Sequence, residues 1–173
     1  MYGVPLSLTQ PGDLHAVLVD AVSGTDIVRQ VTSYHRELSN RSFTLGPPLA
    51  VPTVTTRATA PYLRARAVGD WQSDYDQSAG VVFEQGSAGG RSWSVFASPA
   101  FAGGTSYELD LPDLGATSGF SAAWGLQPGV ATSWTVSASR LENAQQGVPV
   151  DNARSFMAAR GWGGCRDRMA TAP

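Results

Sequence analysis

Three aspartates in one short stretch are the residues of this chain best suited to hold a metal ion. Asp70, Asp74 and Asp76 lie in the run Gly-Asp-Trp-Gln-Ser-Asp-Tyr-Asp-Gln-Ser. Calcium takes about six to eight oxygen ligands, so carboxylates gathered in one loop could begin a calcium site. The spacing is not that of an EF-hand, and Asp and Ser also shape solvated turns between strands. We expect no metal and no other cofactor, and keep these three residues as the calcium candidate.

Four aromatic residues are candidates for binding. Trp71 and Tyr75 flank the aspartates, Trp124 stands at a strand end, and Trp162 lies among glycines near the C-terminus. Exposed rings on loops can stack on sugars or anchor a protein partner. The alternative for the first three is that each closes one end of a core. For Trp162 the alternatives are a flexible tail that docks on a partner, and a tail that is disordered or packs back on its own domain.

The residues needed for catalysis do not fall into a recognised arrangement. No Gly-x-Ser-x-Gly elbow is present, and both histidines, His15 and His35, lie in one N-terminal region. We expect His15 to be structural and His35 to be exposed. Asp110 and Asp113 flank a proline in a turn, where Asp is common, and no Gly-rich loop has the context of a phosphate site. The sequence therefore predicts a protein that is not an enzyme.

Composition and charge narrow the class of partner. The chain has 173 residues with a net charge of −2, so it lacks the basic field that attracts nucleic acid. Cys165 is the single cysteine, which rules out an intramolecular disulfide. No apolar run is long enough to span a membrane, and the N-terminus lacks the pattern of a signal peptide.

Short alternating runs separated by Gly and Pro indicate an all-β protein of antiparallel strands. We predict a hairpin from 14–22 and 27–34, a short strand at 42–45, and further strands at 62–68, 80–84, 91–97, 106–111 and in the run that ends at 138. At the C-terminus, residues 146–154 suit a last strand, whereas 152–160 suit a helix capped by Asp151. We favour a short strand followed by one or two helical turns.

The run Gly46-Pro47-Pro48 interrupts this pattern, because adjacent prolines remove ladder donors. We therefore expect an N-terminal β-hairpin element at 1–46 packed on the sandwich, a β-sandwich at 47–155, and a helical or flexible extension at 156–173.

One run carries a family resemblance. Leu126-Gln-Pro-Gly, followed by Trp134-Thr-Val-Ser-Ala138, resembles the E–F corner and F strand of fibronectin type III domains, which usually read Leu-x-Pro-Gly and Tyr-x-Val-x-Ala. The likeness covers about residues 48–155 and includes the entry at Pro52. Trp134 replaces the usual tyrosine, and the corner is about two residues longer than the family's. The resemblance implies a divergent fibronectin III or immunoglobulin-like sandwich and no particular activity.

The function that these observations favour is a non-catalytic accessory or scaffolding subunit, which stabilises a larger, membrane-associated assembly through contacts with other protein subunits. We favour a place outside the cytoplasm or at the periphery of a membrane complex. The alternative is a carbohydrate-binding or hydrolase-associated module that presents Trp71, Tyr75 and Trp124 to a polysaccharide. A hydrolase with an unrecognised site is the third interpretation.

Overall fold

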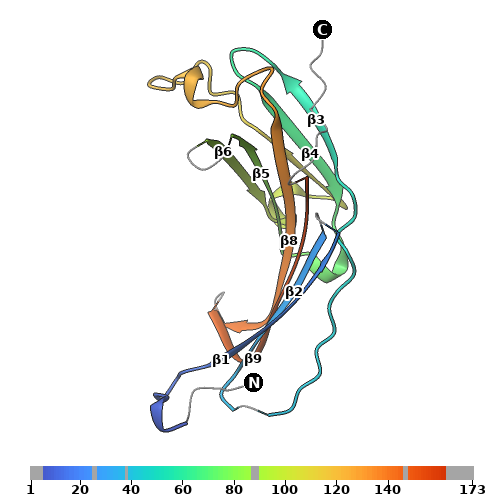
Figure 1. Cartoon of the computed structure of the whole chain (residues 1–173), viewed down its shortest axis with the longest axis vertical. Coiled ribbons are helices and arrows are strands. Elements are labelled where there is room, and N and C mark those ends of the chain that lie inside the picture. The colour runs from blue at the N-terminus through green and yellow to red at the C-terminus, as the bar shows by residue number, and fades with distance from the viewer. Residues whose placement is uncertain (1–5, 25–26, 38, 87–89, 146–147, 163–173) are drawn as a thin grey trace.

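The computed structural model describes residues 6–24, 27–37, 39–86, 90–145 and 148–162. They form two antiparallel sheets that pack face to face, which confirms the predicted all-β sandwich architecture (Figure 1). The larger sheet has the strand order β1-β2-β9-β8-β5-β6, and the smaller has the order β3-β4-β7. The strands are β1 (His15–Ser23), β2 (Ile27–His35), β3 (Thr53–Ala58), β4 (Arg64–Asp70), β5 (Ser78–Gln85), β6 (Arg91–Ala97), β7 (Ser106–Asp110), β8 (Thr132–Gln145) and β9 (Val148–Trp162).

The core lies between the two sheets and is built by alternation along each strand. Leu63, Ala65 and Ala67 face inward, as expected from the sequence, and so do Tyr107 and Leu109 of β7. The larger sheet contributes inward-facing residues from neighbouring strands, and Val81 of β5 lies opposite Val136 of β8. The further buried members of this core are Leu49, Tyr75, Ala79, Phe83, Leu111, Leu126, Ala138 and Ala158.

The helical elements are short and lie in the connections. They are η1 (Leu6–Leu8), η2 (Ser73–Tyr75), α1 (Pro99–Ala102) and η3 (Ala122–Trp124). None of the described helices is long and apolar enough to cross a membrane.

The N-terminal hairpin forms in the predicted place but does not pack on the sandwich as a separate element. Strand β2 pairs with β9 along its length, so β1 and β2 continue the larger sheet beyond the part that faces the smaller one (Figure 1). The expected boundary at residue 46 is therefore crossed by a continuous ladder of backbone hydrogen bonds.

The segment 36–52 runs from the end of β2 to the smaller sheet without the short strand predicted at 42–45. Arginines of the larger sheet hold it through its carbonyl groups: Arg29 donates to Gly46 O at 3.4 Å and Arg160 to Leu49 O at 3.1 Å. The Tyr75 hydroxyl donates to Pro47 O at 2.8 Å. A partly open cavity of about 320 Å³ remains between this segment and the sheet.

The predicted C-terminal helix is wrong. Residues 148–162 form one strand, β9, whose backbone is paired with β2 on one side and β8 on the other. Apolar residues lie on both of its faces, Phe156 and Ala158 inward and Met157 and Ala159 outward, and this mixture imitates a helical pattern. The proposed boundary at 155 falls inside this strand, and residues 163–173, including Cys165, lie outside the described part of the chain.

Candidate interaction surface

The outer face of the larger sheet crosses six strands, and no described strand or helix pairs over it. We call it the open face and define it by the residues of β1, β2, β5, β6, β8 and β9 that point away from the core. One cross-strand row shows its character, because it crosses all six strands. From β6 to β1 the row reads Phe96, Gly80, Ser137, Ala159, Val28 and Val22.

The open face is poor in charge. Its outward residues are mostly Ser, Thr, Gly, Ala and aliphatic residues, and the charged ones are Asp20 on β1 and Glu84 on β5. Larger apolar side chains stand near its two edges: Phe96 is 67% exposed on β6, and Leu18 and Val22 are 54% and 63% exposed on β1. Phe96, Ser98 and Phe101 line a shallow apolar hollow beside it.

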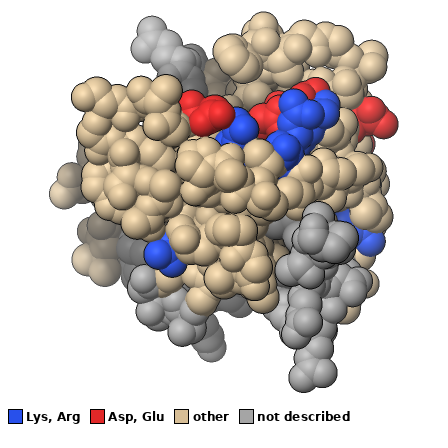
Figure 2. Space-filling model, turned by 90° about the horizontal axis from the view of Figure 1, so that it is seen from above, with Lys and Arg blue, Asp and Glu red and all other residues tan. Residues whose placement is uncertain are grey.

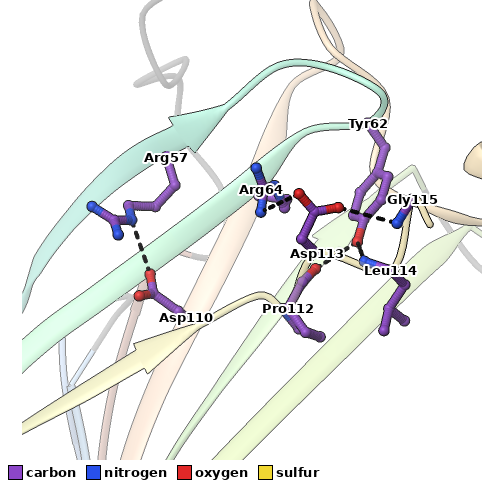
Figure 3. Close-up of polar contacts among 8 residues, drawn as sticks. All are labelled: Arg57, Tyr62, Arg64, Asp110, Pro112, Asp113, Leu114 and Gly115. Carbon is purple, nitrogen blue, oxygen red and sulfur yellow. Dashed lines mark hydrogen bonds and ion pairs between the residues drawn. The ribbon is translucent and has the colours of Figure 1, made fainter. Parts of the chain in front are cut away.

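The outer face of the smaller sheet has the opposite character. Arg57 of β3 pairs with Asp110 of β7 at 3.5 Å, and Arg64 of β4 pairs with Asp113 at 2.9 Å (Figure 3). Arg66 of β4 pairs with Glu108 of β7. Figure 2, which looks onto the top of Figure 1, shows charged side chains gathered in one region and a largely uncharged remainder.

Each of these charged side chains forms an ion pair with a side chain of opposite charge. The pKa of Asp110 is raised, first by burial and then by its hydrogen bond to Glu108. Exposed and half-exposed pairs of this kind contribute little to stability, but they keep the face hydrated. A partner that covered the outer face of the smaller sheet would therefore have to remove more bound water than one that covered the open face.

The predicted aromatic residues are not brought together. Trp124 lies on η3 and is 62% exposed. It belongs to an aromatic cluster in which the ring centroid of Phe120 lies 6.0 Å from that of Trp124 and 5.2 Å from that of Tyr62. Trp71 is half-buried and packs edge-on against Tyr107 at 5.2 Å. Tyr62 precedes β4 and Trp71 follows it, so a seven-residue strand of about 23 Å separates the two clusters.

Tyr75 is not an exposed anchor, and the backbone of Trp162 does not lie in a loop. Tyr75 is 1% exposed and belongs to the core, and burial, together with the charge of Asp74, raises the pKa of its phenol. Trp162 is the last residue of β9, opposite Trp134 in the strand register, and not part of a tail. Of Trp71, Tyr75 and Trp124, Trp124 is the most exposed.

The three aspartates also stay apart. Asp70 ends β4 opposite Ser106, Asp74 lies in η2 beside the cavity under segment 36–52, and Asp76 is 3.9 Å from the guanidinium of Arg140. Among the described residues, no group of three or more Asp, Glu, His or Cys side chains could hold a metal ion. The described positions of these three side chains give no support to the calcium candidate.

The histidines are cross-strand partners on β1 and β2. His35 is 3% exposed, so the expectation that it is exposed is wrong, and its Nε2 lies 2.7 Å from the Ser33 hydroxyl. Burial lowers the pKa of His35, and the positive charge of Arg41 lowers it further. This environment favours a neutral, structural imidazole.

No protein-family model, curated protein or solved structure matches this chain. The functional assignment therefore depends on the surfaces described above.

Sequence reasoning missed two side chains that shape this molecule. Gln85 is 3% exposed and binds the corner loop, accepting from Gln127 N at 2.7 Å and donating to Gln127 O and Thr132 Oγ1 at 2.8 Å. The Tyr62 hydroxyl donates to Pro112 O at 2.5 Å and accepts from Leu114 N at 2.8 Å (Figure 3). The sequence held one signal for Gln85, since a polar residue stands there at an inward position of a strand pattern.

Proposed function

We propose that this chain is a non-catalytic interaction module that docks on another protein subunit through its open face. The observation that carries the proposal is the contrast between the two outer faces: ion pairs cover the smaller sheet, whereas a cross-strand row without charge crosses the larger one. Depletion of charge at the centre, with larger apolar residues available to anchor a partner, is the composition of a protein interface.

We further propose that the sandwich is a divergent member of the fibronectin III or immunoglobulin-like class. Counting from β3, the first, second and fifth strands form one sheet, and the third, sixth and seventh lie together in the other. This division agrees with the immunoglobulin-like plan, in which strands A, B and E face strands C, F and G. The β1–β2 hairpin is then an addition to the edge of the final strand, and it enlarges the open face.

The carbohydrate-binding alternative has less support. It required Trp71, Tyr75 and Trp124 to form one platform, but Tyr75 is buried and β4 separates the other two. We therefore favour a protein partner.

The test is co-purification with the partner subunit from the native source, using the full chain with Thr135→Arg. Thr135 is exposed near the centre of the open face. An arginine there would have to be desolvated without a partner, so we expect capture to fall by at least about tenfold. Retention of every interaction partner by this variant would overturn the proposal.

The matched control is Thr55→Arg, which places the same substitution at an exposed threonine on the outer face of the smaller sheet. We expect this variant to capture the partner as the wild type does. Equal loss in both variants would indicate a general effect of added charge and would also count against the open face.

A further inference from the structure

Three of the four sheet edges in the described structure carry features that discourage pairing with another strand. Strand β3 has a register shift between Thr56 and Ala58 and presents Arg57. Strand β7 has only five residues and includes Glu108 and Asp110.

On the third edge, strand β6, the η3 turn is attached to the first residues of the strand. The Arg91 side chain donates to Ala123 O at 3.0 Å, and the Trp93 indole donates to Trp124 O at 3.3 Å.

The fourth edge, β1, is the longest of the four and carries one charged residue, Asp20. It is nine residues long, contains no Pro, Lys or Arg, and pairs with β2 without a register shift. Its outward residues include Leu18 and Val22, which are 54% and 63% exposed. Among the described residues, β2 is its only neighbour in the sheet. Such an edge offers unpaired backbone groups to another strand.

We propose that β1 pairs with β1 of a second copy of this chain, antiparallel about Val19, so that two six-stranded sheets join into one. Val19 is the midpoint of the strand, so this register pairs all nine residues. It places Val17 opposite Ala21 and Ala16 opposite Val22, and each pair lies on one face of the joined sheet.

The single charged residue of β1 is compatible with the same register. Centring the pair on Asp20 would place two carboxylates directly opposite each other, which is destabilising. Centring it on Val19 places each Asp20 opposite Leu18 of the other copy, while the two carboxylates are only diagonal neighbours in solvent. The register that pairs all nine residues of β1 is therefore also one that avoids charge repulsion between the two copies. This agreement favours a second copy of the chain over an unrelated strand.

The inference concerns the edge of the larger sheet and goes beyond the proposed function of its face. Pairing at β1 would place two open faces side by side in one continuous surface.

The experiment measures self-association of the full chain by sedimentation equilibrium over about 1 µM to 1 mM. We expect the wild type to form dimers in this range. Leu18→Arg places a guanidinium opposite Asp20 of the second copy twice per dimer, so we expect the dissociation constant to fall by on the order of tenfold. Leu18→Asp places two carboxylates opposite each other, and we expect the constant to rise by a similar factor or more.

The double variant Leu18→Asp/Asp20→Arg exchanges the charges, and it should dimerise as tightly as Leu18→Arg. Thr55→Asp on the exposed β3 is the matched control and should leave the dissociation constant unchanged. Because Leu18 and Asp20 are exposed, circular dichroism and urea unfolding should show that every variant is folded.

A monomer at every concentration would overturn the inference, and so would a dimer that responds equally to Leu18→Arg and Leu18→Asp. Its failure can be separated from failure of the proposed function. A monomeric chain that still captures its partner would reject only the dimer, whereas a dimer whose partner capture is insensitive to Thr135→Arg would reject only the open face as the docking surface.

Discussion

At the scale of single residues, the structure depends on buried polar side chains that bridge distant loops. Gln85 on β5 satisfies both backbone groups of Gln127 and so holds the turn that leads into β8. Tyr62 does the same for the loop after β7 through its hydroxyl. Each side chain supplies partners that the irregular backbone cannot find in a ladder, and each is therefore costly to remove.

We expect Gln85→Leu to lower the free energy of unfolding by about 1–3 kcal/mol, since Gln127 N–H and C=O would lose their partners in a partly buried place. Urea denaturation measures this change.

The control for this variant is Gln30→Leu, which makes the same substitution on the open face of β2 and should change stability by less than about 0.5 kcal/mol. Similar losses in the two variants would contradict the role assigned to Gln85.

At the scale of elements, β9 organises the larger sheet. It is paired on both sides from Arg154 to Arg160, with β2 on one side and β8 on the other. The hairpin at the N-terminus and the sandwich strands therefore share one central strand. Strand β1, in contrast, has a neighbour on one side only among the described residues.

Amide hydrogen exchange should reflect this difference. At a concentration below that of self-association, we expect amides of 154–160 to be among the slowest to exchange, and alternate amides of β1 to exchange much faster because they point away from β2. Nuclear magnetic resonance can measure both sets. Exchange in β9 as fast as in β1 would show that residues 154–160 do not lie in the centre of the sheet.

At the scale of the whole molecule, the hairpin and four strands of the sandwich share one sheet. Contacts outside the ladder reinforce the join, because Arg36 N donates to Asp151 at 2.9 Å and Arg29 reaches Gly46 O across the connecting segment. Val31 of the hairpin is 1% exposed. Removing the hairpin would expose one edge of β9 and unpair its backbone.

We therefore expect a chain of residues 47–173 to lose roughly 3–5 kcal/mol of stability and to self-associate through the exposed β9. Thermal unfolding and light scattering measure the two effects. A chain of residues 15–173 is the control, since it keeps the hairpin and should behave as the full chain does. A stable, monomeric 47–173 would instead support the division at residue 46.

Most of the sandwich could be predicted from the sequence because alternation is a local property. The inward sets around Ala65, Val81 and Leu109 follow from a period of two residues, and the turn at Gly129, with φ of 75°, follows from Pro-Gly. The last strand could not be predicted, because a strand buried between two neighbours carries apolar residues on both faces and loses its alternation.

The sequence by itself determined the fold class, the strand faces and the low net charge, since each depends on residue type and short-range spacing. Only the tertiary structure decided which surfaces remain open. It buried Tyr75 and His35, separated Trp71 from Trp124, and left the outer face of six strands and the edge of β1 without a cover among the described residues. Exposure depends on which elements pack together, and long-range pairing of this kind is not encoded in any single segment.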